Sequence, residues 1–444
     1  MLITNARVAT LGADPRLIED GAILIRDRHI DAIDTTAALI GAHPEERRLD
    51  AEGQLALPAL LCAHTHFYGA LAQGWSYPGP AASRFGEVLE RLWWRLDTHL
   101  TLEDVRYSAL VCLVDAIRHG TTTLIDHHAS PNAIDGSLDV IAEAVKAAGV
   151  RAALAYEVTD RGGPERARAG LMENSRFLRR LQRDPHPQLG ASFGLHASLT
   201  LSDATLEDAV AAGADLNTGF HLHGAEGVED VEDSLAKSGL RVVERLHKAG
   251  VLGPQTILAH AVHVDSHEME VLAQTGTWVT HQPRSNMNNA VGFSPVEKLL
   301  DHGVKVALGN DGFSNNMFAE MKAAYLGHKL VRRDPRAMPA NVVLGLAFDA
   351  NAELARLFWP QQQLGVLTPG AEADLVLLDY LPPTPLTAGN LPWHMIFGYE
   401  ASAITATISA GKVLMWNRRL LTLDELAIKA RARELARDLW ARAG

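Results

Sequence analysis

The amino-acid sequence predicts an α/β protein in which a (β/α)8 barrel is combined with a small β-sandwich domain. The first observation is size, because a chain of 444 residues is longer than most single domains, and its 47% of hydrophobic residues can supply a large core. The second is an alternation of short apolar runs, polar loops and longer helical patterns between about residues 58 and 360. The third is that strand-like segments return near the C-terminus, after this alternation ends.

The alternating region contains the candidate strands of the barrel. Each candidate is a short run rich in apolar and β-branched residues, and each precedes a loop and a helical pattern. Repeated strand and helix units over about 300 residues are typical of a (β/α)8 barrel, whose active site lies at the carboxyl ends of the strands. The eight candidate strands are 56–66, 121–126, 151–156, 189–195, 217–223, 256–260, 277–281 and 304–309.

The two ends of the chain are predicted to form the small β domain together. Strand patterns with turn signals cover 2–9 and 21–33, and similar patterns return at 373–379 and 403–414. The simplest interpretation is one domain assembled from both ends, with the barrel inserted between them. The predicted limits are 1–57 for the N-terminal part of the sandwich, 58–361 for the barrel, and 362–444 for the C-terminal part with a terminal helix.

The last segment is predicted to be helical. Glu425 follows Thr422 by three residues, which is the spacing of a capping box, and an amphipathic pattern continues from there. We therefore expect a helix that begins close to Thr422.

Composition restricts the partners and the compartment. The net charge of -12 argues against nucleic acid or an anionic membrane surface as the main partner. No run reaches the roughly 18 apolar residues of a membrane span, and the N-terminus lacks the pattern of a secretion signal. The only cysteines are Cys62 and Cys112, too few for a disulfide framework. These features favour a cytoplasmic protein with a small-molecule substrate.

Metal-type side chains stand at the ends of four candidate strands. The first strand ends in His64-Thr-His66, and residues two apart on a strand project to the same side. The fifth strand ends in His223, the sixth in His260, and Asp311 follows the eighth. All five therefore lie on the predicted catalytic rim, where they can surround one ion.

These motifs resemble the amidohydrolase superfamily over nearly the whole chain. The stretch His221-Leu-His223-Gly-Ala-Glu226 is similar to the His-x-x-Glu motif of the branch that contains guanine deaminase, S-adenosylhomocysteine deaminase and the triazine chlorohydrolases. Three further segments resemble the SsnA group of aminohydrolases, namely 93–97, 125–131 and 284–289.

The resemblance implies a single divalent metal ion. Its ligands would be His64, His66, His223 and Asp311. Zinc is the preferred ion and iron the alternative, since three imidazoles and one carboxylate serve either. The fourth candidate strand carries no lysine of the kind that bridges two metals in other branches, so we expect a mononuclear site.

The resemblance also implies catalytic roles. Asp311 would accept a proton from a water activated by the metal, and Glu226 would carry protons to the substrate ring nitrogen and the leaving group. His260 would polarise the substrate or steady the attacking oxygen rather than bind the metal.

Several histidines have alternative interpretations. His221 lies on the same strand face as His223 and could replace it as a ligand, although the spacing to Glu226 favours His223. His127 and His128 follow the second strand, where they could line the pocket or cap the strand end. We retain His128 as a candidate substrate contact.

Three other positions are candidates of the same kind. His196, after the fourth strand, aligns with a substrate-contacting histidine of the branch. Arg284, after the seventh strand, could meet a substrate group or form a surface ion pair. Trp93 and Trp94 are interpreted as helix packing rather than as a stacking platform.

The predicted function is hydrolytic deamination of an aminated heterocycle of the purine, pterin or pyrimidine type. The alternatives are hydrolysis of a cyclic amide or of a carbon–chlorine bond at the same site, and a metal-binding protein without catalysis. Retention of Glu226 and His260 speaks against the last of these, since a structural metal site needs neither. The resemblance further implies a homo-oligomer, a dimer or larger.

Overall fold

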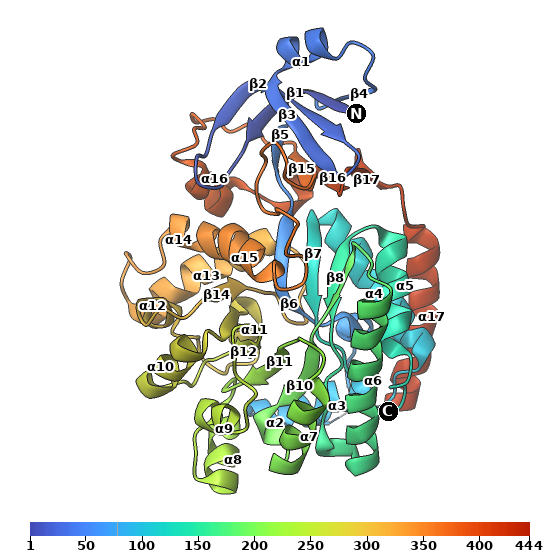
Figure 1. Cartoon of the computed structure of the whole chain (residues 1–444), viewed down its shortest axis with the longest axis vertical. Coiled ribbons are helices and arrows are strands. Elements are labelled where there is room, and N and C mark those ends of the chain that lie inside the picture. Colours follow the sequence, from blue (N-terminus) through green and yellow to red (C-terminus); the bar gives the residue numbers. More distant parts are fainter. Residues whose placement is uncertain (78) are drawn as a thin grey trace.

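The computed structural model of the protein describes residues 1–77 and 79–444, and its larger part is a closed parallel barrel (Figure 1). Neighbouring strands pair in parallel all along the barrel. β9 and β10 are two halves of one strand interrupted at Ser192, and a parallel bridge between Thr65 and Asp311 joins the first strand to the last. The barrel strands are β6 (Leu60–Thr65), β7 (Thr121–Asp126), β8 (Arg151–Leu154), β9 (Leu189–Ala191), β10 (Phe193–Ala197), β11 (Phe220–Gly224), β12 (Ile257–His260), β13 (Trp278–His281) and β14 (Val306–Leu308).

Helices surround this barrel and begin where the sequence supplies caps. α4 starts with a capping box formed by Thr101 and Asp104, and α6 has Pro164 at its first position. The helices that follow the strands are α4 (Leu102–Arg118), α5 (Ser137–Ala148), α6 (Pro164–Arg183), α7 (Asp203–Gly213), α8 (Val228–Ser238), α9 (Val242–Lys248), α10 (Ser266–Thr275), α11 (Pro283–Asn288), α12 (Val296–Asp301), α13 (Met317–Arg332), α14 (Ala340–Gly345) and α15 (Asn351–Ala355). Shorter elements are η1 (Phe67–Ala72), α2 (Phe85–Val88), η2 (Leu89–Trp93), α3 (Trp94–Asp97), η3 (Asp160–Gly162), η4 (Ser198–Thr200) and η5 (Leu346–Ala350).

The two chain ends form a separate sheet, as Figure 1 shows at the top of the molecule. β5 pairs antiparallel with β15, and this pair joins the N-terminal strands to the C-terminal ones. Apolar side chains from both ends, including Ile23 and Leu377, share one buried cluster. The elements are β1 (Leu2–Ala9), β2 (Leu17–Arg26), β3 (His29–Thr35), α1 (Thr36–Ala42), β4 (Arg48–Asp50), β5 (Leu55–Pro58), β15 (Leu375–Leu378), α16 (Leu391–Gly398), η6 (Ala401–Ala403), β16 (Ile404–Ser409), β17 (Lys412–Trp416) and β18 (Arg419–Leu420).

The structure confirms the predicted fold class and refines individual elements. β1 and β7 have the predicted bounds, whereas the candidate strand 56–66 is divided between the two sheets. β5 belongs to the small sheet and β6 to the barrel, and the backbone N–H of Ala59 between them donates to the carbonyl of Asp374. The chain therefore passes from the small sheet to the barrel close to residue 58. The predicted domain limits remain a prediction.

The predicted terminal helix is present, but the capping box predicted at Thr422 is wrong. α17 (Glu425–Ala443) has Asp424 as its N-cap, whose side chain accepts a hydrogen bond from the N–H of Ala427. Thr422 instead donates to the carbonyl of Ala148, and Glu425 pairs with Arg118. These contacts with the barrel layer displace the capping box, and α17 packs on α4. Within the described part of the chain, no helix is both long enough and apolar enough to cross a membrane.

Candidate metal centre and active site

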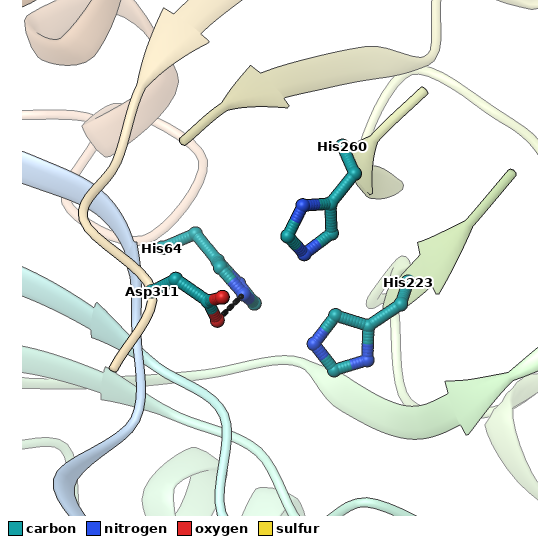
Figure 2. Close-up of side chains that lie close together, drawn as sticks. All are labelled: His64, His223, His260 and Asp311. Carbon is teal, nitrogen blue, oxygen red and sulfur yellow. Dashed lines mark ion pairs between the residues drawn. The ribbon is translucent and has the colours of Figure 1, made fainter. Parts of the chain in front are cut away.

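The strand ends bring the predicted metal-type side chains to one place. Figure 2 shows His64, His223, His260 and Asp311 converging from four separate segments, with ligand atoms that all lie within 4.8 Å of one another. The Oδ1 atom of Asp311 lies 2.8 Å from Nε2 of His66 and 3.4 Å from Nε2 of His64. Nε2 of His66 lies 3.2 Å from Nε2 of His223. A compact His/Asp cluster therefore occupies the carboxyl end of the barrel.

Local backbone irregularities aim these side chains. β6 has a register shift between Cys62 and Thr65, just where His64 stands, and such bulges re-aim side chains at barrel rims. His260 and Asp311 adopt positive φ angles of 77° and 58°, which non-glycine residues rarely do. Such conformations are costly and cluster at functional sites, because only the surrounding structure holds them in place.

Hydrogen bonds at the Nδ1 atoms leave the Nε2 atoms free. Nδ1 of His66 contacts the carbonyl oxygen of His127 at 2.6 Å, and Nδ1 of His223 contacts that of His196 at 2.8 Å. A carbonyl oxygen only accepts, so both Nδ1 atoms carry a proton, and in the neutral form of each ring Nε2 then keeps a lone pair. Nδ1 of His64 lies 2.8 Å from Nε2 of His221, while Nε2 of His64 is buried without a hydrogen-bond partner. Three imidazole nitrogens and one carboxylate are the donor set of a divalent transition-metal site, so these residues fit such an ion.

His260 has the opposite arrangement. The side-chain amide of Asn286 donates to its Nδ1 at 2.9 Å, which places the imidazole proton on Nε2. Nε2 lies 3.4 Å from Oε2 of Glu226 and is buried. Although His260 belongs to the four-residue cluster by distance, this tautomer makes it a hydrogen-bond donor toward the site.

Burial and charge divide the ionisable groups of the site. Burial lowers the pKa of His64 well below its ordinary value, which keeps the ring neutral. For Asp311, burial opposes ionisation, but the close contacts of its carboxylate with the imidazoles of His64 and His66 hold its pKa well below the ordinary value. Burial, reinforced by the charge of Asp311, raises the pKa of Glu226 well above its ordinary value. One carboxylate is therefore stabilised as an anion and the other as a neutral acid.

A cavity opens directly onto this cluster. Its non-atom space is about 630 Å³, part of it continuous with solvent. Aromatic rings make up much of its wall, which suits a flat apolar ring with a few polar atoms. The lining residues are His66, Tyr68, Phe85, Leu89, Trp93, Trp94, His196, Ala197, Leu199, His223, Glu226, Asp230, Asn289, Asp311 and Gly312.

The candidate substrate contacts differ in position. His196 lines the cavity, with Nδ1 2.7 Å from Oγ1 of Thr200. His128 is fully buried outside the cavity wall and contacts the Ser130 hydroxyl at 2.9 Å. Arg284 also lies outside the wall, because its guanidinium pairs with the buried carboxylate of Glu320 at 2.5 Å. Of the three, the structure brings only His196 to the cavity.

Trp93 and Trp94 both line the cavity, and the interpretation as helix packing alone was too narrow. The guanidinium of Arg161 lies 4.9 Å from the centre of the Trp94 ring and contacts Asp97 at 2.6 Å. This contact fixes one face of the indole.

Sequence reasoning missed several neighbours of the site. Glu157, just beyond β8, lies with Oε1 3.3 Å from Nδ1 of both His66 and His127. Burial raises the pKa of this carboxyl, but its contact with Nδ1 of His66 and the other nearby histidines lower that pKa to about 2. Asn289 donates to Oε1 of Glu226 at 3.3 Å. The position of Glu157 after a barrel strand was the only available signal.

The chain is similar to known proteins over its full length. Residues 55–414 match the sequence profile described as the Amidohydrolase family. A 5'-deoxyadenosine deaminase of Methanosarcina mazei is 32% identical over 446 residues, covering 100% of this chain and 99% of the relative. A 5-methylthioadenosine/S-adenosylhomocysteine deaminase of Syntrophomonas wolfei is 33% identical over 445 residues, covering 99% of each chain.

Solved structures show the same fold. An adenosine deaminase from Xanthomonas campestris with bound zinc superposes with a TM-score of 0.85 at 25% identity, covering 99% of this chain and 98% of that one. The atrazine chlorohydrolase TrzN from Arthrobacter aurescens, complexed with zinc, has a TM-score of 0.81 at 24% identity, covering 98% and 99%. The barrel with its accessory sheet is therefore shared by zinc-containing proteins.

Proposed function

Because the chain belongs to the amidohydrolase family, as its motifs predicted, we propose that it is a hydrolytic deaminase of an adenosine-type ring. One observation carries the proposal: the acid Glu226 lines a cavity walled by aromatic rings and lies 3.4 Å from the buried donor His260, beside the imidazole cluster. A structural metal site needs neither residue. The reaction replaces an exocyclic amino group by oxygen, and water and the aminated ring yield ammonia and the oxo ring.

The proposed ligands of one divalent ion are His64, His66, His223 and Asp311. Their support is the set of Nδ1 hydrogen bonds of His66 and His223, which turns Nε2 of His66 toward the Asp311 carboxylate and Nε2 of His223 toward Nε2 of His66. When bound, zinc, or alternatively iron, supplies a Lewis acid that makes water nucleophilic near neutral pH.

The side chains of the chain then handle the protons. Asp311 accepts the proton of the attacking water, for which its low pKa keeps it ionised. Glu226 begins as the neutral acid, protonates the ring nitrogen next to the reacting carbon, and later passes a proton to the departing ammonia. His260 donates its Nε2 hydrogen to the attacking oxygen and holds it in line.

The cavity supplies the binding of the ring. Trp93, Trp94, Tyr68 and Phe85 offer flat apolar surfaces, and His196 adds a polar contact. His128 and Arg284 act indirectly, through the packing of the strand ends, since both are engaged outside the wall.

An ammonia-release assay tests the function. The zinc-loaded protein is offered 5'-deoxyadenosine, 5'-methylthioadenosine, S-adenosylhomocysteine, adenosine and guanine, with Glu226→Gln as the control. Ammonia from an adenosine-type substrate, absent with the variant, is the expected result. If none of the five compounds releases ammonia, and the protein instead releases chloride from a chlorotriazine or opens a cyclic amide, then it is a hydrolase of another kind.

We also propose a homo-oligomer that acts in the cytoplasm. Its two cysteines, Cys62 and Cys112, are both free, which suits a reducing compartment. The similarity to the SsnA group stays a prediction.

A further inference from the structure

The three proposed imidazole ligands are not held in the same way. His66 and His223 each use a backbone carbonyl, which no substitution of a side chain removes. His64 uses a side chain, since its Nδ1 lies 2.8 Å from Nε2 of His221. The orientation of His64 therefore depends on the identity of one other residue.

His221 is itself fixed by its surroundings. The ring is fully buried and stacks on His127, with centroids 4.4 Å apart and planes inclined by 23°. Nδ1 of His127 lies 3.3 Å from Oε1 of the buried Glu157. The stacked imidazoles of His221 and His127, with the Glu157 carboxylate next to them, thus support His64 on β6.

We propose that His221 is a positioning residue of the metal site, which accepts the Nδ1 hydrogen of His64 and so presents Nε2 of His64 to the ion. The proposal rests on the proposed metal site. In that tautomer Nε2 of His64 keeps its lone pair, and the proton of His221 lies on Nδ1. Partners of this kind typically change metal affinity by about 10–100-fold when they are removed.

The same geometry argues against His221 as a ligand in place of His223. Nε2 of His221 is engaged by His64, whereas Nε2 of His223 lies 3.2 Å from Nε2 of His66. In His221-Leu-His223, the second histidine is therefore the proposed ligand and the first is the positioning residue.

Three substitutions at one position test the proposal. In His221→Gln the amide oxygen reaches the place of the imidazole Nε2 and still accepts a hydrogen bond. His221→Met has similar length without an acceptor, and His221→Asn is polar but too short. Zinc affinity is measured by competition with a chromophoric chelator, and thermal unfolding of the metal-free forms reports folding.

The expected result is a zinc Kd raised about 10–100-fold in His221→Met and His221→Asn, with His221→Gln close to the unmodified protein. His281→Met serves as the matched control, because His281 is also buried at a strand end but packs on Phe293 and His328. Its zinc affinity should not change.

Equal zinc affinity in all His221 variants would overturn the proposal, as would a His221→Gln protein as weak as His221→Asn. If His221→Met does not fold, the comparison of Gln with Asn decides alone. Failure of the unmodified protein to bind zinc would instead refute the proposed metal site.

Discussion

Both ends of the barrel bury polar and charged side chains, but they differ in how completely those side chains are paired. At the amino end, Arg151 contacts Glu372 at 2.5 Å and Asp374 at 2.6 Å, beneath the small sheet. Asp374 also accepts from the Thr122 hydroxyl at 2.7 Å and from the N–H of Ala410 at 2.7 Å. None of these side chains is among the buried groups without a partner in the described residues.

The carboxyl end is the opposite case. Among residues 1–77 and 79–444, no hydrogen-bond partner is found for buried nitrogens of His64, His127, His221 and His260 or for one oxygen of Glu157. Unpaired buried polar atoms are costly, so a cluster of them marks a place where a fold can bind a ligand or ion. The paired groups at the amino end therefore form a structural joint, whereas the carboxyl end holds a cluster of polar atoms that could bind an ion.

Metal removal gives the largest expected effect and acts on the carboxyl end alone. Chelation should reduce turnover to background and lower the stability of the zinc-loaded protein by about 4 kcal/mol if zinc was present at 1,000 times its Kd. The reason is that the buried nitrogens and Asp311 lose their shared partner. Calorimetric unfolding with and without chelator measures the loss of stability, and re-addition of zinc is the control. An unchanged unfolding temperature after complete metal loss would contradict the comparison.

Substitution of Arg151 by methionine acts on the amino end. It leaves the buried carboxylate of Asp374 without its cation and Glu372 with one arginine, Arg28, and breaking a buried ion pair in this way costs about 3–5 kcal/mol. Thermal unfolding should shift to lower temperature, while the folded fraction keeps its zinc affinity and KM. Arg183→Met, at an exposed position of α6, is the control. A loss of zinc affinity that matches the loss of stability would show that the two ends are not independent.

Glu226→Gln separates chemistry from metal binding within the carboxyl end. The amide cannot carry the proton, so turnover should fall by about 10²-fold or more. Zinc should remain near one per chain, because the substitution removes no proposed ligand. Steady-state ammonia release and metal analysis measure the two quantities. Glu232→Gln, on the exposed side of α8, makes the same charge change and should behave like the unmodified protein.

Much of this contrast was visible in the sequence. Apolar runs that end in His64, His223 and His260 predict both the strands and the rim on which these residues lie, because strand ends meet at one face of a barrel. The spacing from His223 to Glu226 likewise predicts an acid beside the metal-type cluster.

Contacts between separate elements could not be predicted. The proton positions of His64 and His260 depend on His221 and Asn286, which lie far from them in the chain. Arg284 follows a strand in the expected way, yet Glu320 on α13 holds it outside the cavity. The Thr422 cap failed for the same reason, since Ala148 offered that hydroxyl a tertiary partner.

The smallest expected effect concerns two neighbouring threonines of β7. The Thr122 hydroxyl donates to Asp374, whereas the Thr123 hydroxyl is buried and has no partner in the part of the chain that the structure describes. Because a hydrogen bond to a charged group contributes about 1.5–3 kcal/mol, Thr122→Val should destabilise the protein by about that amount. Thr123→Val should be neutral or slightly stabilising, since it removes a hydroxyl that burial already penalises. Both variants keep the β-branched shape, so unfolding measured side by side isolates the hydrogen bond. Equal destabilisation by both would mean that packing around β7, rather than complete pairing, holds the amino end together.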